Sequence, residues 1–219
     1  MPRAGPSRSR PVTTTSKRPR VEGDREAEVL DAAVRVLAEV GYDRLTMDHV
    51  AAEARASKAT LYRRWSSKAD LVVDAVSRAK GLPGPDQPDT GTLRGDLLAL
   101  ACGPAGLADR FPMSVLGGLL TALHNDPELS TAWRERFLAP RMAVTRAVFD
   151  RAVRRGEVDA DIDLEVLHTV LPSMCAFRST VLGHVVDESF VADVLDQVVL
   201  RAAAPAATPP PSRRKSLEH

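Results

Sequence analysis

The sequence predicts an all-α protein of about nine helices in two bodies, because apolar residues recur at helical spacing in nearly every periodic segment. No segment shows the alternating pattern of a β-strand. A stretch rich in proline and glycine, residues 81–91, separates the two bodies. The charge is also unevenly divided: residues 1–65 carry 13 Lys and Arg against 9 Asp and Glu, whereas residues 66–200 carry 13 against 19. A basic N-terminal third on an acidic remainder indicates that one end of the molecule binds a polyanion.

The first body begins with a helix predicted over residues 24–40. Its apolar residues fall on one face, Asp24 can accept hydrogen bonds at its N-terminus, and Gly41 can end it. A short second helix follows Thr46, whose hydroxyl is a typical N-cap.

Two further helices complete the first body. One is predicted over residues 57–65, and the next runs from Ser67 to about residue 80, with Ser67 and Asp70 at the spacing of a capping box. The second and third helices, joined by a short turn, form a predicted helix-turn-helix.

Helical patterns resume beyond the linker over residues 93–107, 113–124, 127–155, 164–182 and 189–203. Pro140 and Pro172 lie inside two of these patterns, and each should kink or split its helix because proline lacks a backbone donor. We therefore divide the chain into a basic disordered arm (1–23), a helix-turn-helix domain (24–80), a linker loop (81–91), a second helical domain (92–204) and a disordered tail with a tag remnant (205–219).

The predicted third helix has two faces of opposite character. At about 100° per residue, Leu61 and Trp65 fall on one side, and Ala59, Thr60 and Arg63 fall on the other. The apolar pair would anchor the helix to its neighbours. The outer face is suited to the major groove, since Arg can pair with guanine and a Thr methyl group can touch thymine.

Cationic and hydroxyl side chains flank this outer face at Lys58, Tyr62 and Arg64, where they can reach phosphates. The alternative is a solvated basic helix in an ordinary bundle. The order of a capped short helix, a turn and a Ser-capped basic helix favours DNA binding.

The segment "LTMDHVAAEARASKATLYRRWSSKADLV" resembles the DNA-binding signature of the TetR (tetracycline-repressor) family of bacterial regulators. The matching residues are Thr46, Val50, Ala51, Ala54, Ser57, Lys58, Thr60, Leu61, Tyr62, Ser67, Lys68 and Leu71. Beyond residue 76 the resemblance covers only the architecture and a short "RAVRRGEV". It implies a helix-turn-helix domain followed by an all-α domain that binds a ligand and dimerises.

Three residues depart from the family pattern. Arg55 stands where the turn usually has glycine, and it would carry strain of about 1 kcal/mol if that site needs a positive φ. Otherwise the turn tolerates it, and Arg55 then lies close to the phosphates. Ala59 replaces a glycine on the base-facing side, and Trp65 replaces a phenylalanine in the core.

The resemblance implies a role for each residue of the DNA-binding face. Phosphate contacts are expected from Thr46, Ser57, Lys58, Tyr62 and Lys68, and base contacts from Ala59, Thr60 and Arg63. The N-terminal arm carries Arg3, Arg8, Arg10, Lys17, Arg18 and Arg20. It is either a disordered solubilising tail or an arm that enters the minor groove.

The second body is expected to dimerise through its last two helices. The predicted interface residues are Val170, Val181, Leu182, Val191, Val194, Leu195 and Val198. Burial within their own chain is the alternative. A ligand pocket is predicted among Leu116, Leu120, Phe137, Met142, Met174 and Phe177, since Met and aromatic side chains make adaptable linings, although each could be plain core.

No metal-binding pair, phosphate-cradling loop or nucleophile motif occurs in the sequence, so we expect neither an enzyme nor a cofactor or metal. The apolar runs are shorter than a membrane span and the basic N-terminus has no apolar segment after it, which favours a cytoplasmic protein without a membrane partner.

The predicted function is therefore that of a ligand-responsive, sequence-specific transcriptional regulator. We expect a homodimeric repressor that a small, largely apolar or aromatic molecule releases from a palindromic operator in double-stranded DNA. The alternatives are an architectural DNA-binding protein without a ligand and, less in keeping with the motifs, a helical enzyme with an incidental helix-turn-helix.

Overall fold

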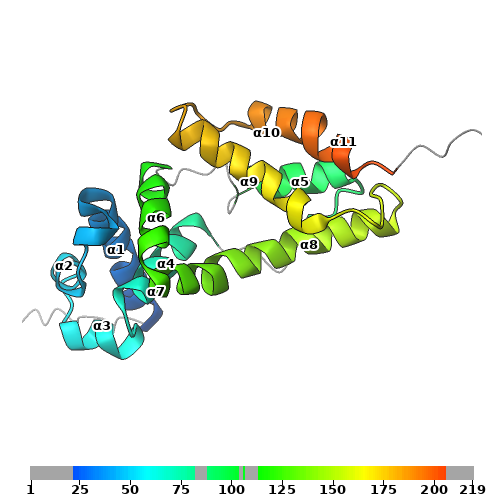
Figure 1. Cartoon of the computed structure of the whole chain (residues 1–219). Helices are drawn as coiled ribbons and strands as arrows, with labels where there is room; N and C mark the ends of the chain where they lie inside the picture. The colour runs from blue at the N-terminus through cyan, green and yellow to red at the C-terminus, as the bar shows by residue number, and fades with distance from the viewer. Residues whose placement is uncertain (1–21, 82–87, 104–105, 107–112, 206–219) are drawn as a thin grey trace, which may run out of the picture.

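The computed structural model describes residues 22–81, 88–103, 106 and 113–205. All regular structure in these ranges is helical, which confirms the predicted fold class. Figure 1 shows helices α1 to α4 at one end of the molecule and α5, α9, α10 and α11 at the other. Within the described ranges, none of the helices combines the length and apolar character needed to cross a bilayer.

Helix α1 (Glu22–Arg44) changes direction near its end. Gly41 has a φ of 74° and a ψ of 167°, so the helical conformation is interrupted where the sequence predicted a stop. A positive φ suits glycine because it has no Cβ. One further turn, ending at Arg44, then leads into the second helix.

The next three helices each begin at a hydroxyl cap, as predicted. Thr46, Ser57 and Ser67 each accept a hydrogen bond from the backbone N–H three residues later. These caps satisfy donors that a helix N-terminus leaves free. The helices are α2 (Met47–Glu53), α3 (Lys58–Arg64) and α4 (Lys68–Lys80).

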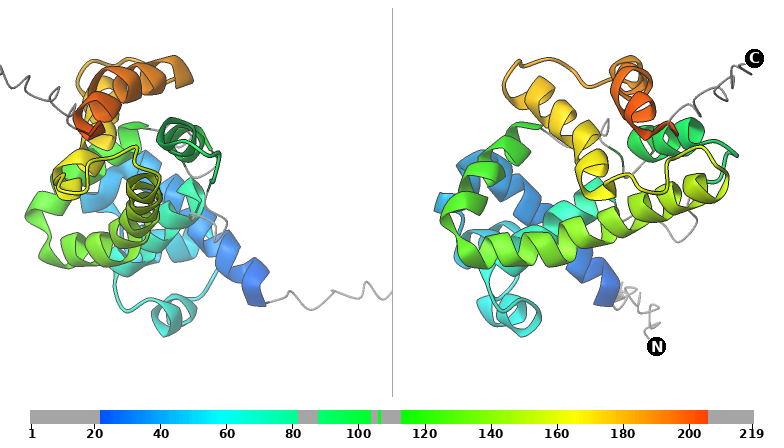
Figure 2. Two further views of the ribbon diagram at one scale, coloured as in Figure 1. Left: turned by 90° about the vertical axis from the view of Figure 1, so that its right-hand side faces the viewer. Right: turned by 45° about the vertical axis from the view of Figure 1, so that its right-hand side comes forward.

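The remaining helices follow the linker. They are α5 (Leu93–Cys102), α6 (Met113–Asn125), α7 (Pro127–Ala132), the π-helical η1 (Trp133–Leu138), α8 (Ala139–Arg154), α9 (Leu164–Thr180), α10 (Glu188–Val194), the π-helical η2 (Leu195–Val199) and α11 (Leu200–Ala203). Figure 2 shows α8 running from the α1–α4 end of the molecule to the other end, where α9 and α5 lie.

The two prolines behave differently. Pro140 lies in the first turn of α8, directly after η1, so the helical type changes there. Pro172 lies inside α9, which continues from Leu164 to Thr180 without a break, so the prediction of a split is wrong at this position. Pro172 is exposed.

Two hydrophobic cores hold the described residues together, and they do not divide the chain at the linker. The first core contains the apolar faces of α1 to α4 and also Leu119 of α6, Leu129 of α7, and Trp133 and Phe137 of η1. The second core is built by α5, the end of α8, α9, α10, η2 and α11. Because α6, α7 and η1 pack against the first body, and α8 enters the second core, the two bodies are mechanically connected.

Candidate nucleic-acid interface

The turn between α2 and α3 is built around a strained residue. Arg55 has a φ of 50°, so the turn does require the left-handed conformation and an arginine adopts it. The Ala56 N–H donates to the Ala51 carbonyl oxygen at 2.8 Å, and Arg25 Nη2 donates to the Arg55 carbonyl oxygen at 2.6 Å. These bonds stabilise the turn and leave the Arg55 side chain exposed beside the N-terminus of α3.

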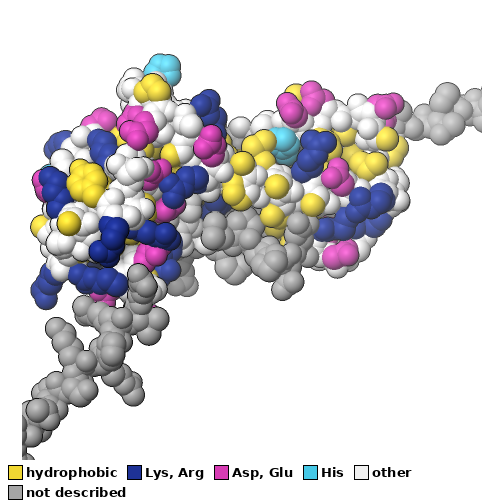
Figure 3. Space-filling model, turned by 90° about the horizontal axis from the view of Figure 1, so that it is seen from below, with side chains coloured by type: hydrophobic (Ala, Val, Ile, Leu, Met, Phe, Trp, Pro, Cys, Tyr) yellow, Lys and Arg dark blue, Asp and Glu magenta, His cyan; other side chains and the backbone are white. Residues whose placement is uncertain are grey.

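The two faces of α3 are as predicted. Leu61 is 0% exposed and Trp65 is 3% exposed, so both anchor the helix in the first core. Ala59 and Arg63 are exposed, and Thr60 is half-buried. Figure 3 shows Lys and Arg side chains gathered on this body with acidic side chains among them. The outer face of α3 is therefore accessible to a DNA groove.

Hydroxyl groups on this face already serve as caps. Ser57 Oγ accepts from Thr60 N at 3.1 Å and shares a hydrogen bond of 2.7 Å with Thr60 Oγ1. Thr46 Oγ1 accepts from His49 N at 3.2 Å. Capping by Thr46 uses an acceptor lone pair, so its hydroxyl proton can still be donated to a phosphate.

Lys58 forms an ion pair with Asp48 that the sequence analysis did not predict. Its Nζ donates to Asp48 Oδ2 at 3.0 Å and lies 5.9 Å from the centroid of the Tyr62 ring. The hydrogen bond to Asp48 raises the pKa of Lys58, and both side chains are more than half exposed. A DNA phosphate would therefore compete with Asp48 for this ammonium group. Ten residues and a turn separate the pair, so no short-range pattern reveals it.

Lys68 contacts the end of α1. Its Nζ donates to the Tyr42 carbonyl oxygen at 3.2 Å and lies 4.2 Å from the centroid of the Tyr42 ring. Tyr42 in turn donates from its hydroxyl group to Asp126 Oδ2 at 2.7 Å; burial and this carboxylate raise the pKa of Tyr42. Lys68 thus connects the end of α1 to α4, and its ammonium group retains donors for a phosphate.

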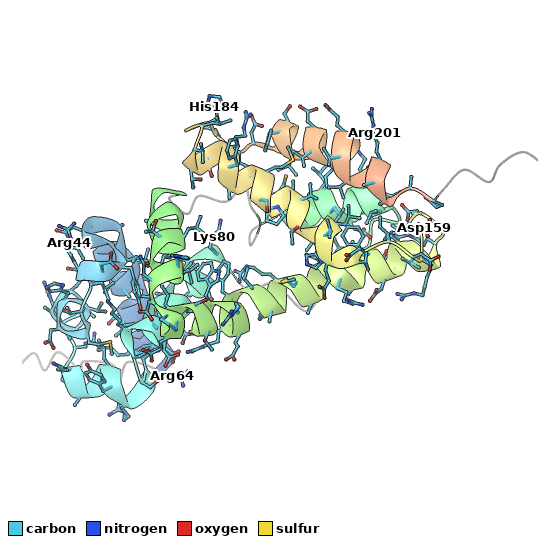
Figure 4. All side chains as sticks on the ribbon, viewed as in Figure 1. Arg44, Arg64, Lys80, Asp159, His184 and Arg201 are labelled. Atoms are coloured by element: carbon cyan, nitrogen blue, oxygen red, sulfur yellow. The ribbon has the colours of Figure 1, made fainter. Side chains whose placement is uncertain are left out.

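The two arginines at the end of α3 differ. Arg64, labelled in Figure 4, donates to Glu26 Oε1 of α1 at 3.1 Å. Arg63 is exposed and forms no hydrogen bond or ion pair within the described part of the chain. Arg63 is therefore the better placed of the two for base contact. The predicted N-terminal arm, residues 1–20, lies outside the described residues.

The predicted ligand-pocket residues do not enclose a common cavity in the described part of the chain. Leu120, Met142, Met174 and Phe177 are between 38% and 55% exposed. Phe137 is buried, with its ring stacked on Trp133 at 3.9 Å and under the Arg141 guanidinium at 3.8 Å. The side chain of Leu116 lies outside the described residues. Two hollows on the described surface, one between α1, α4 and η1 and one between α8 and α9, are lined by other residues.

The predicted interface residues separate into two groups. Val191, Val194 and Leu195 are at most 3% exposed and belong to the second core, so their assignment to a dimer interface is corrected: their side chains already pack within their own chain. Val198 is 38% exposed, whereas Val181 and Leu182 are at least half exposed, and Val170 is half-buried.

Helix α9 has one buried and one exposed apolar face. Leu167, Leu171 and Cys175 form the buried face. The exposed face, which we call the α9 stripe, follows at helical spacing and consists of the exposed Val166, Met174, Phe177 and Val181 with the half-buried Val170 between them. An exposed apolar stripe of this length is typical of an interaction surface.

Comparison with known protein families gives two matches. The family described as bacterial regulatory proteins, tetR family, matches residues 29–75. The family described as tetracyclin repressor-like, C-terminal domain, matches residues 87–198. Together they cover the helix-turn-helix and most of the second body.

Individual relatives agree with these matches. A DNA-binding transcriptional repressor TetR of Mycobacteroides abscessus is 38% identical over 183 residues, which are 84% of this chain and 96% of the relative. The uncharacterized HTH-type transcriptional regulator YdeS of Bacillus subtilis is 31% identical over 87% of this chain and 96% of its own length.

Solved structures show the same fold. The crystal structure of one TetR family transcription regulator superposes with a TM-score of 0.57 at 30% identity, covering 83% of this chain and 100% of that one. A TetR transcription regulator from Haloarcula marismortui gives a TM-score of 0.59 at 18% identity over 84% of this chain and 100% of its own. The second of these supports the fold alone.

Proposed function

This chain belongs to the TetR family of bacterial regulatory proteins, and from that premise we propose that it represses transcription as a homodimer on a palindromic operator until a small, largely apolar molecule releases it. Its relatives are DNA-binding transcriptional regulators, and one is a repressor. DNA-binding repression is thus the general function. The palindrome, the dimer and the releasing molecule are the parts that we propose.

The observation that supports sequence-specific binding most directly is the outer face of α3. Ala59 and Arg63 are exposed, while Leu61 and Trp65 fix the helix from behind. A guanidinium group can donate two hydrogen bonds to guanine, and the small side chain at Ala59 lets the helix approach base edges closely. Because Arg63 forms no ion pair within the described part of the chain, DNA binding need not break one there.

A dimer would present two copies of α3 at a fixed spacing, as a palindromic operator requires. Two recognition helices on one face of DNA must enter successive major grooves, about 34–36 Å apart, and a fixed interface sets that spacing. The α9 stripe offers an apolar surface for a second copy of the chain. A symmetric interface of this kind presents the same residues from both protomers.

Release by a small molecule follows from the same arrangement. A ligand that binds the second body more tightly in one conformation shifts the population of that conformation, by no more than its differential affinity. The exposed apolar side chains of Leu120 and Met142, which lie outside the α9 stripe, favour an apolar ligand over a charged one.

The first test is selection of bound duplexes from random DNA with the full chain and with Arg63→Ala. We expect an enriched motif with inverted half-sites. Arg63→Ala should cost about 1–3 kcal/mol and relax the preference at one base position of each half-site, because it removes a base contact. Ala substitution at Arg44, an exposed arginine at the end of α1, is the control and should keep the motif. Selection without any enriched motif would exclude sequence-specific repression.

A further inference from the structure

The end of the recognition helix is connected to the second body through a single arginine. Trp65 directly follows α3, and its indole Nε1 donates to Asp74 Oδ2 of α4 at 2.9 Å. Arg136 of η1 places Nη2 at 2.6 Å from both carboxylate oxygens of Asp74. The indole and the guanidinium therefore share one carboxylate, which fixes their positions relative to each other.

Arg136 also binds a second carboxylate, that of Asp70. Arg136 Nη1 donates to Asp70 Oδ1 at 2.5 Å, and Ser66 Oγ donates to the other oxygen of Asp70. Ser66 is the neighbour of Trp65, so both residues that follow α3 are tied to carboxylates held by one guanidinium. We call the set Ser66, Trp65, Asp70, Asp74 and Arg136 the α3–η1 relay.

Arg136 lies in η1, the segment that joins the first core to helix α8. Trp133 and Phe137, on either side of it in η1, are buried in the first core with their rings stacked. Helix α8 continues from η1 into the second core through Val148 and Phe149. A π-helical segment such as η1 is a helical irregularity often found at functional sites. Helix α8 and η1 therefore form one continuous helical segment between the second core and Arg136.

We propose that Arg136 is a positioning residue for DNA binding: through Asp74 and Asp70 it sets the orientation of the end of α3, and so makes base contact depend on the state of the second body. This inference rests on the proposed function. Trp65 stands where the family pattern has phenylalanine, which has no N–H to donate, so the indole branch depends on the tryptophan of this chain.

Stability alone does not explain the arrangement. The Arg136 side chain is 39% exposed, and the carboxylates are 24% and 27% exposed, so solvent partly screens the ion pairs and limits their contribution to the free energy of unfolding. The planar guanidinium group, with one terminal nitrogen on each carboxylate, also restricts direction, which the single ammonium group of a lysine does less well. Base contacts require positions held within a fraction of an ångström, so a restricted direction affects specific binding first.

The test compares Arg136→Gln with Arg134→Gln in the full chain. Both changes remove one positive charge from η1, but Arg134 is exposed and its Nη2 donates to Thr131 Oγ1 of the preceding helix at 3.4 Å. We expect Arg136→Gln to lower affinity for the selected duplex about tenfold, within the usual range for coupling residues, with little change for an unrelated duplex of equal length. Equal losses in the two variants, or equal losses on the two duplexes, would overturn the proposal.

The other end of the relay gives an independent measurement. Trp65→Phe keeps the ring in the core and removes the N–H, so it should also weaken specific binding, and it should add little when Arg136→Gln is already present. Additive losses, or unchanged specific affinity in Trp65→Phe, would show that the residues act separately. The result for Trp65→Phe alone stands even if Arg136→Gln fails to fold.

A signal that needs no DNA separates this inference from the proposed function. The indole N–H resonance of Trp65 in a nitrogen–proton NMR spectrum is identified by its loss in Trp65→Phe. We expect it to shift in Arg136→Gln and to stay in place in Arg134→Gln. A shift without any selected DNA motif would support the relay while the proposed function fails. An unmoved resonance in folded Arg136→Gln would overturn the relay alone.

Discussion

Arg55 is the residue of the DNA-binding face whose backbone geometry is least usual. Its φ of 50° is the one positive value among non-glycine residues of the described ranges. Holding a side chain in this region costs on the order of 1 kcal/mol. The strained residue also carries an exposed cation next to the N-terminus of α3, where a phosphate is expected to bind. The sequence identified the position and the possible strain, but whether the turn needs a positive φ depends on packing.

At this scale we predict that Arg55→Gly and Arg55→Ala differ in stability although both remove the same guanidinium group. The glycine variant should unfold with a free energy about 1 kcal/mol higher than the alanine variant, because alanine retains the strain. Urea denaturation measures the difference. Both variants should lose one phosphate contact, lowering the slope of log K against log salt by about 0.9. An alanine variant as stable as the glycine variant would contradict the strain.

Helix boundaries in the first body were predictable because they depend on local chemistry. Thr46, Ser57 and Ser67 cap the helices that the sequence assigned to them. The rule that proline interrupts a helix was less reliable at Pro172. This residue is exposed, and α9 continues past it without a break.

The apolar faces of α9 and α10 were harder to assign. Periodicity identifies a face that avoids water but not the chain against which it packs. Thus Val191 and Val194, predicted at the interface, fill the core of their own chain, whereas Val166 and Phe177 remain exposed.

For the α9 stripe we predict that Val181→Glu prevents dimerisation. The side chain is 65% exposed in the protomer, so a carboxylate there should leave the single chain folded. In a symmetric dimer the change buries two charges without partners, which is strongly destabilising. Thr169→Glu is the control, since Thr169 is exposed on α9 about 100° from the centre of the stripe. Sedimentation at micromolar concentration should give a monomer for the first and a dimer for the second. If both variants sediment as dimers, the interface does not include Val181.

On the scale of the whole molecule, contacts between distant segments decide how the two bodies are connected. Tyr42 meets Asp126, and Arg136 meets Asp74, across 84 and 62 residues of chain. No sequence pattern indicates such pairs, because each partner is an ordinary polar residue on its own helix. For the same reason the linker at 81–91 suggested two separate bodies, although α6, α7 and η1 pack with the first core. The architecture could be predicted, but the coupling between its parts could not.

The central claim is that two copies of this chain hold one palindromic duplex. The most direct measurement is analytical ultracentrifugation of the chain with a labelled duplex carrying two selected half-sites about 34–36 Å apart, beside a duplex with one half-site. We expect the free protein to sediment as a dimer at micromolar concentration, and the palindrome to bind two protomers far more tightly than the single half-site does. A monomer that binds both duplexes equally well would contradict the dimer and, with it, the control of DNA binding by spacing.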